Sequence, residues 1–149
     1  MIALDTNILV YAAMQGEDAR HAAAIDIQAR LIDRTIVIPT QVLGELYNVL
    51  VRKAAMPSSR AAALALELTA GCVLIAADAE DMQEALVLAS THSLQIWDAL
   101  ILVVSARAGC ALLLSEDMQD GFVYRGMIVA NPFADTPHPL LASMLESAP

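Results

Sequence analysis

Four acidic residues stand at positions where an ordinary surface charge is not expected. Asp5 ends the first apolar run of the chain, and Asp117 closely follows a later one. Asp98 opens the most apolar segment of the chain, and Glu45 lies within the segment VLGELYNVLV. Each also has a structural alternative, because Asp5 and Asp98 suit helix caps and Asp117 suits a turn. For Glu45 the alternative is a solvated charge on a helix.

Binding of a divalent cation is the chemistry that these four carboxylates would share. Like charges within a few ångströms raise each other's pKa, so four carboxylates in one pocket need a counter-charge to stay ionised. Mg²⁺ or Mn²⁺ prefers oxygen ligands and keeps several waters for a reaction. Zinc is not indicated, since His21, His92 and His138 are far apart and lack cysteines at ligand spacing. We interpret each histidine as a surface residue.

The elements that must position these acids alternate along the chain. Short apolar runs predict buried strands at residues 1–4, 35–38, 72–75 and 111–114, with a fifth at 122–124 and 127–129. Helices are predicted between them, at residues 6–14, 17–33, 40–53, 57–70, 78–91 and 98–108, with Gly16, Gly71 and Gly109 as breaks and Thr40 as a cap. Continuous apolar strands that alternate with helices predict an α/β fold, with a parallel sheet of four to five strands covered on both faces.

This arrangement predicts that the four acids converge. Asp5 and Asp117 follow strands, and in parallel sheets ligands bind beyond the carboxyl ends of the strands. Glu45 lies at the border of the apolar helical stripe formed by Val42, Leu43, Leu46, Val49 and Leu50, grouped with Gln41, Asn48 and Arg52. The helix of Glu45 and the helix that Asp98 opens would flank the same edge of the sheet.

The segments that contain the acids resemble a known family. LDTNILVYA, PTQVLGELYNVL, LQIWDALIL and LLSEDMQDG match, in order and spacing, the four acidic motifs of PIN-domain nucleases, and they look most like VapC toxins of bacterial type II toxin–antitoxin pairs. The resemblance covers about residues 1–133, where YRGMIVANPF also fits it, and leaves residues 134–149 as a proline-containing C-terminal tail. It implies a PIN-like, three-layer α/β/α fold.

The resemblance also implies roles for individual residues. The implied ligands of one or two Mg²⁺ or Mn²⁺ ions are Asp5, Glu45, Asp98 and Asp117, with Asp120 as a further acid that only some relatives possess. The polar residues at the family's supporting positions are Thr6, Asn7 and Ser115.

Phosphodiester hydrolysis is the reaction that such a site performs. A metal lowers the pKa of a bound water and neutralises charge on the phosphate. The family implies an RNA substrate, and a narrow acidic pocket favours single-stranded regions. Arg52 and Lys53 share or adjoin the face of Glu45 and are candidate phosphate contacts, with ordinary surface charge as the alternative.

As a toxin, the chain is expected to form a homodimer and to bind a cognate antitoxin that covers the pocket. An inactive PIN domain that serves only as an interaction module is one alternative. A receiver-type signalling domain also binds Mg²⁺ at strand ends, but it normally has an early acidic pair and a lysine after a late strand. Here Asp5 is single, and the only lysine is Lys53.

The composition of the chain further restricts its possible fold and the way it could bind RNA. The 149 residues are 58% hydrophobic and 17% charged, which favours one folded domain and excludes intrinsic disorder. Seventeen acids against eight bases give a net charge of −9, unlike the basic surface of most nucleic-acid binders. Four of these acids belong to the predicted pocket, and two bound divalent ions would bring the net charge to −5. A steep salt dependence of RNA binding is therefore not expected.

Nothing in the sequence indicates a membrane or an export signal. No uncharged apolar run reaches the roughly 18–20 residues that a membrane span needs. The first residues, MIALD, lack the basic region of a signal peptide. Cys72 and Cys110 lie in apolar segments, and we interpret them as buried thiols in the reducing cytoplasm rather than as a disulfide or half of a zinc site.

Overall fold

The computed structural model describes residues 1–14 and 19–146. Within these residues the strands are β1 (Ile2–Leu4), β2 (Ile36–Pro39), β3 (Val73–Ile75), β4 (Leu112–Leu114), β5 (Val123–Tyr124) and β6 (Met127–Ala130). The helices are α1 (Thr6–Ala13), α2 (Ala19–Arg30), α3 (Thr40–Arg52), α4 (Ser58–Leu68), α5 (Ala79–His92), α6 (Ile96–Arg107) and α7 (Pro139–Glu146). The expected break at Gly16 and helix start at residue 17 lie outside the described residues.

The strands form one mixed, mostly parallel sheet in the order β3-β2-β1-β4-β6-β5. β1 lies in the middle and pairs in parallel with β2 and with β4, where Leu4 is in register with Leu114. The predicted α/β fold is confirmed, but six strands are described rather than four or five. The segment expected as a fifth strand folds back as an antiparallel hairpin, because Arg125 and Gly126 both adopt positive φ and make a tight turn between β5 and β6.

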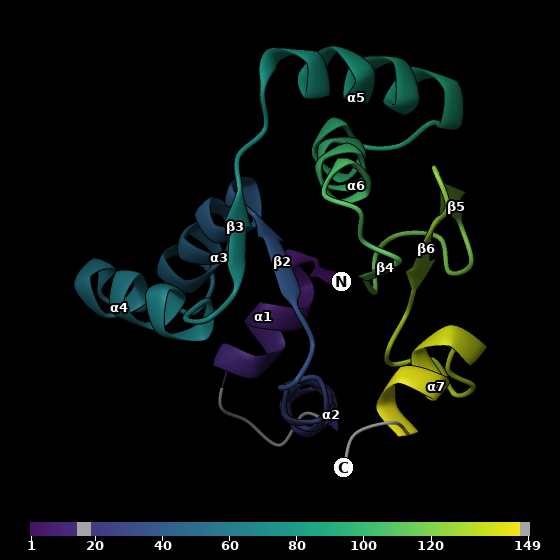
Figure 1. Ribbon diagram of the computed structural model, residues 1–149. Helices are drawn as coiled ribbons and strands as arrows, with labels where there is room; N and C mark the ends of the chain where they lie inside the picture. The colour runs from purple at the N-terminus through teal and green to yellow at the C-terminus, as the bar shows by residue number, and fades with distance from the viewer. Residues whose placement is uncertain (15–18, 147–149) are drawn as a thin grey trace.

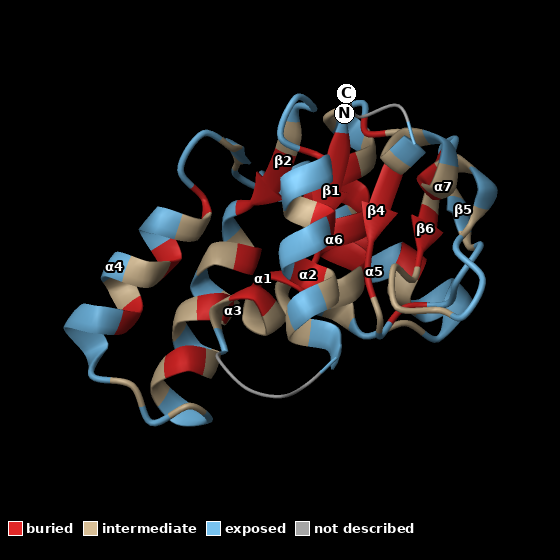
Figure 2. Cartoon of the chain, turned by 90° about the horizontal axis from the view of Figure 1, so that it is seen from below, coloured by how far each residue is buried: buried red, intermediate tan, exposed pale blue. Residues whose placement is uncertain are grey.

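Helices cover both faces of the sheet, as three layers require. Figure 1 shows α5 and α6 on one side of the sheet and α1, α2 and α7 on the other, while α3 and α4 lie together at the β3 end. The central strands are apolar and buried along their whole length, and in α6 every residue from 99 to 105 is buried (Figure 2). This explains why β1, β4 and α6 read as continuous apolar runs.

Two helix starts differ from the expectation. α6 begins at Ile96, so Asp98 lies in the first turn of the helix and does not cap it. Thr40 is the first residue of α3, and the capping position belongs to Pro39, which has no side-chain donor or acceptor. Asp5, in contrast, does cap α1, because its carboxylate accepts a hydrogen bond from the Thr6 amide.

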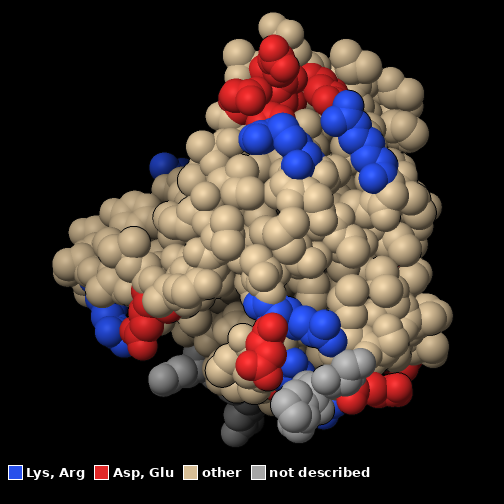
Figure 3. Space-filling model, in the orientation of Figure 1, with Lys and Arg blue, Asp and Glu red and all other residues tan. Residues whose placement is uncertain are grey.

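Beyond the sheet, the C-terminal segment contributes to the core through α7, whose Leu141 is fully buried. Cys72 is half-buried and Cys110 is buried, and both are free thiols. On the face drawn in Figure 3, charged side chains gather over the α5 end and the α2 end and leave a wide uncharged area between them. No helix among the described residues is both long enough and apolar enough to cross a bilayer.

Candidate functional site

A cavity of about 500 Å³ lies beyond the carboxyl ends of β1 and β4. The residues that line it are Asp5, Thr6, Asn7, Val10, Tyr11, Met14, Glu45, Asn48, Val49, Lys53, Asp98 and Asp117. The fold therefore brings together the four carboxylates that the sequence singles out, although they come from positions as far apart as 5 and 117. We call this cavity the acidic pocket.

Asp5 lies at the bottom of the acidic pocket and is only 5% exposed. One carboxylate oxygen accepts a hydrogen bond from the Thr6 amide at 2.6 Å. The other oxygen accepts from Ser115 Oγ at 2.6 Å and from Asn7 Nδ2 at 3.1 Å. Ser115 itself is fully buried and receives a hydrogen bond from the Met118 amide at 3.3 Å. These bonds fix the orientation of Asp5 before any ligand binds.

Burial and mutual repulsion perturb the ionisation of two carboxylates in the pocket. Burial raises the pKa of Asp5 from its usual 3.8 to about 6, although hydrogen bonds from Ser115 and Thr6 oppose the rise. The charges of Asp98 and Glu45 contribute smaller increases to this value. The pKa of Asp98 is also raised, first by burial and then by two neighbouring carboxylates. A cation in this pocket would relieve that repulsion and favour the ionised forms.

Glu45 faces the pocket from α3, and its two carboxylate oxygens have different partners. Thr6 Oγ1 donates to Oε2 at 2.7 Å, which connects α3 to the start of α1. Gln41 Nε2 donates to Oε1 at 2.8 Å from one helical turn earlier. The apolar side of α3 buries Val42, Leu46 and Leu50. Glu45 therefore occupies the border between the core and the polar side of the helix, as its position in the sequence predicts.

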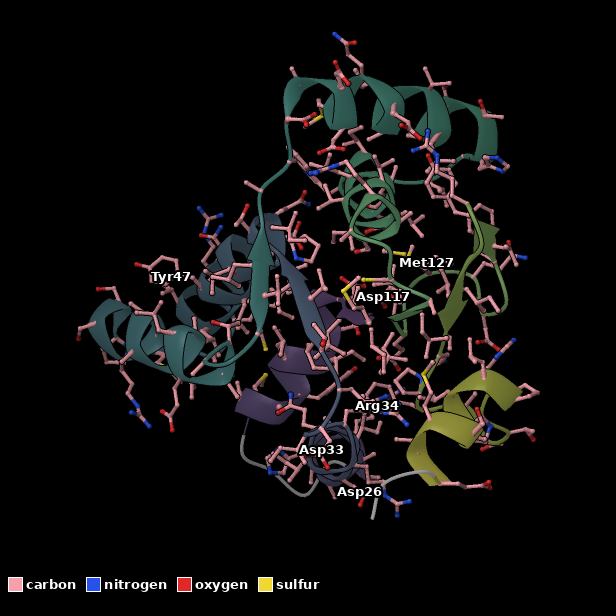
Figure 4. All side chains as sticks on the ribbon, in the orientation of Figure 1. Asp26, Asp33, Arg34, Tyr47, Asp117 and Met127 are labelled. Atoms are coloured by element: carbon pink, nitrogen blue, oxygen red, sulfur yellow. The ribbon has the colours of Figure 1, made fainter. Side chains whose placement is uncertain are left out.

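The loop after β4 presents Asp117 and is attached to α1 by side-chain contacts. Asn7 Nδ2 donates to Asp117 Oδ2 at 3.2 Å, and the Glu116 amide donates to Asn7 Oδ1 at 3.4 Å. The Glu116 carboxylate accepts from Tyr11 Oη at 2.6 Å and forms an ion pair with Arg20 at 2.6 Å. Figure 4 shows Asp117 near the middle of the molecule, beside β4.

Of the three other candidate residues, only one lines the acidic pocket. Lys53 lines the acidic pocket, whereas Arg52, its neighbour on α3, does not. Asp120 is not among the lining residues, and its carboxylate accepts a hydrogen bond from the Asn131 amide at 2.8 Å. That bond ties the loop after β4 to the residue that follows β6.

The donor set of the acidic pocket fits a hard divalent cation. The charged atoms that could ligate a metal are all carboxylate oxygens, and the lining includes no histidine or cysteine. In the described part of the chain, no three Asp, Glu, His or Cys side chains lie close enough together to enclose an ion. Mg²⁺ commonly retains several waters and binds through one or two carboxylates, so a partly hydrated ion suits this spacing.

Several side chains that shape the site were not predicted as part of it. Gln41 donates a hydrogen bond to Glu45 from four residues earlier. The sequence could have predicted this contact, because residues at i and i+4 are neighbours on a helix and both lie on the polar border of α3. The contacts of Tyr11 and Arg20 with Glu116 cross more than 90 positions of sequence, and no local pattern indicates them.

Comparisons with known proteins agree with this geometry. The family model described as PIN domain matches residues 2–120. The crystal structure of VapC20 from Mycobacterium tuberculosis, a sarcin-ricin loop cleaving toxin, is 24% identical with a TM-score of 0.61, covering 76% of this chain and 87% of its own. VapBC2 from Rickettsia felis, bound to a promoter DNA fragment, is 20% identical with a TM-score of 0.63, covering 87% and 97%.

A toxin–antitoxin complex from Klebsiella pneumoniae is 19% identical, with a TM-score of 0.63 and coverage of 89% of this chain and 98% of the other. At such low identities, these likenesses establish a shared fold. A search of curated protein sequences found no significant match.

Proposed function

Because the chain belongs to the PIN-domain family, we propose that it is a Mg²⁺- or Mn²⁺-dependent endoribonuclease that acts as the toxin of a toxin–antitoxin pair. The observation that carries the proposal is the acidic pocket, in which Asp5, Glu45, Asp98 and Asp117 line one cavity at the carboxyl edge of the sheet. PIN domains are typically nucleases, and the structural neighbours of this chain include VapC toxins.

The four carboxylates would hold one or two divalent ions. A bound Mg²⁺ or Mn²⁺ supplies a water of lowered pKa and positive charge next to the phosphate. Asp5 is held in place by three hydrogen bonds, and Glu45 is oriented by Thr6 and Gln41. Asp98 faces the same cavity from the first turn of α6.

Asp117 completes the set and is positioned by Asn7. Lys53 lies in the lining and would contact a phosphate oxygen through its ammonium group, whereas Arg52 would act outside the pocket along the same helix. Asp120 is not in the lining, and its carboxylate is bonded to the Asn131 amide, so we assign it no metal-binding role. These assignments give each residue a separate test by substitution.

Single-stranded RNA is the proposed substrate. The cavity of about 500 Å³ is within the size range of small-molecule sites and accommodates a nucleotide rather than a duplex. The excess of acids elsewhere on the chain disfavours extended contact with a duplex, whose binding depends on many phosphate contacts. A cytoplasmic location is proposed as well, because PIN toxins are typically cytoplasmic.

A cognate antitoxin would silence this site. The structures from Rickettsia felis and Klebsiella pneumoniae are toxin–antitoxin assemblies, and by analogy we propose a partner that covers the acidic pocket and places a basic side chain among the carboxylates. A homodimer is proposed from membership of the PIN-domain family alone. The carboxylate repulsion described above makes a cationic side chain a favourable inhibitor.

Purified protein incubated with labelled single-stranded RNA and Mn²⁺, with and without a chelator, tests the proposal. Asp5→Asn and Asp98→Asn should abolish cleavage and divalent-ion binding measured by calorimetry. Asp33→Asn is a matched control, because Asp33 is exposed and lies away from Asp117 in Figure 4. Cleavage retained in both pocket variants would overturn the assignment. Metal and RNA binding without cleavage by the wild type would instead identify an inactive interaction module.

A further inference from the structure

A second cavity, of about 390 Å³, adjoins the acidic pocket. It is lined by Gln41, Gly44, Glu45, Asn48 and Trp97, and we call it the Trp97 groove. Glu45 and Asn48 line both cavities, so the groove is continuous with the candidate catalytic site. A polymer whose phosphate lies among the carboxylates would therefore extend directly into the groove.

Trp97 is placed as a flat apolar wall of this groove. It immediately precedes Asp98 in the first turn of α6, and 51% of it is exposed. The residues from 99 to 105 of the same helix are all buried, so the exposed indole is not required for the packing of α6. An exposed aromatic face next to a candidate phosphate site is a typical stacking platform for the bases of single strands.

The opposite wall of the groove, on α3, leaves room and offers polar groups. Gly44 stands in the middle of α3, and a Cβ atom built there would meet nothing within 4 Å. A glycine inside a helix makes the helix less stable than an alanine would. A need to keep the space beside Trp97 open would explain why a glycine stands here.

Gln41 adds a hydrogen-bonding group to this wall. Its Nε2 donates to Glu45 and, at 3.4 Å, to the Trp97 carbonyl, whereas its buried Oε1 has no partner among the described residues. The two donated bonds hold the Gln41 side chain between Glu45 and the backbone of Trp97, so it forms a fixed part of this wall.

We propose that the Trp97 groove binds one nucleobase of a single-stranded RNA, next to the phosphate held in the acidic pocket. The base stacks on the Trp97 indole and fits against the bare backbone of Gly44. This inference rests on the proposed ribonuclease function and identifies where that site recognises its substrate. Trp97 acts as a substrate-binding residue and does not touch the reacting atoms.

The tryptophan provides a direct readout, because Trp97 is the only one in the chain. The experiment titrates the full-length protein with a single-stranded octamer of adenylate, A8, with Ca²⁺ in place of Mg²⁺ to prevent cleavage. Stacking should quench the Trp97 emission. An abasic octamer with the same sugar-phosphate chain should bind more weakly and leave the emission unchanged. Binding of A8, detected by anisotropy of a labelled strand, without any change in tryptophan emission would overturn the proposal.

Substitutions at Trp97 separate stacking from general apolar contact. Loss of one stacked base corresponds to about a 5- to 150-fold weaker interaction, so Trp97→Ala should raise KM for A8 by that factor with little change in kcat. Trp97→Phe should retain most of the affinity, and Trp97→Leu should not. Leu86→Ala is the matched control, since Leu86 is an exposed apolar residue of α5, away from both cavities. Equal KM values for Trp97→Ala and Leu86→Ala would contradict the proposal.

Gly44→Leu adds a test in which folding and binding move in opposite directions. Leucine favours the helix, so the melting temperature should rise, while its side chain fills the groove and weakens A8 binding. A lower melting temperature together with weaker binding would indicate a folding defect, and unchanged binding would refute the groove as a base site.

Failure of the inference is distinguishable from failure of the proposed function. If the wild type cleaves RNA but Trp97→Ala does so with unchanged KM, the Trp97 groove is not a base site and the ribonuclease proposal stands. If the wild type neither binds divalent ions nor cleaves RNA, the function itself fails. A concentration-dependent change in tryptophan emission without RNA, matched by dimerisation in sedimentation, would assign Trp97 to contact with a second copy and overturn the inference.

Discussion

Replacing Asp5 by asparagine is expected to remove a large part of the pH dependence of folding stability in the metal-free protein. The Asp5 side chain is almost fully buried, and its pKa is about 6 instead of 3.8 because burial disfavours the charged form. The folded state therefore binds a proton more tightly than the unfolded state does. As a consequence, the free energy of unfolding falls as the pH rises from about 4 to above 6.

The size of this effect follows from the two pKa values. One pKa unit corresponds to about 1.4 kcal/mol, so full ionisation of Asp5 in the fold costs about 3 kcal/mol of stability. Between pH 5 and pH 8, about half of that, near 1.4 kcal/mol, should be lost. The raised pKa of Asp98 also lowers the free energy of unfolding as the pH rises, and this contribution is present in both the wild type and Asp5→Asn. The difference between wild type and Asp5→Asn isolates the term that belongs to Asp5.

Urea unfolding followed by circular dichroism, in a chelating buffer at pH 5 and at pH 8, measures this difference. From pH 5 to pH 8, the free energy of unfolding should fall by about 1.4 kcal/mol more in the wild type than in Asp5→Asn. At pH 8, saturating Mn²⁺ should then stabilise the wild type by about 2.7 kcal/mol at 100 times the dissociation constant, and the variant by much less. Identical pH slopes in the two proteins, or a wild type that becomes more stable with rising pH, would refute the reasoning.

Three further substitutions and one titration test other parts of the structure. Ser115→Ala removes the 2.6 Å donor to Asp5 and should cost about 1–3 kcal/mol in urea unfolding at pH 8, while moving Mn²⁺ activation to higher concentration. Arg107→Ala leaves the buried carboxylate of Asp81 without its bidentate partner and should lower stability by about 2 kcal/mol or more without changing metal affinity measured by calorimetry. Glu116→Gln removes the ion pair of the loop after β4 and should reduce kcat several-fold with the fold intact by circular dichroism. RNA affinity measured from 50 to 200 mM salt should show a shallow slope, equal to only a few phosphate contacts, and a slope of six or more would reveal a basic track on the surface.

The parts of the fold that the sequence predicts well are those decided by continuous burial. β1 and β4 are apolar throughout, and α6 is buried from residue 99 to 105, because the core surrounds these segments. Their bounds agree with the apolar runs to within about two residues. The hairpin of β5 and β6 was harder to predict, because its turn is made by Arg125 at positive φ, an unfavourable conformation that only the pairing of the two strands explains.

In the candidate site, too, some features could be predicted from the sequence and others could not. Its four carboxylates are conspicuous in the sequence because they interrupt apolar runs, and strand-end geometry predicts that they meet in one pocket. Their supporting contacts depend on side-chain geometry across the fold, such as Tyr11 with Glu116, and have no local signal. The sequence does not single out Trp97, because its exposure depends on how the rest of α6 packs.

The pairing of β1 with β4 has a consequence for the timing of activity during synthesis. Asp5 follows β1, but its partner Ser115 and the nearby Asp117 follow β4, which is made about 110 residues later. At roughly 5–20 residues per second, translation takes about 6–20 s to produce that segment. A nascent chain therefore carries no complete acidic pocket until residue 117 has been made, and before that point the messenger RNA in its own ribosome is not exposed to an assembled site.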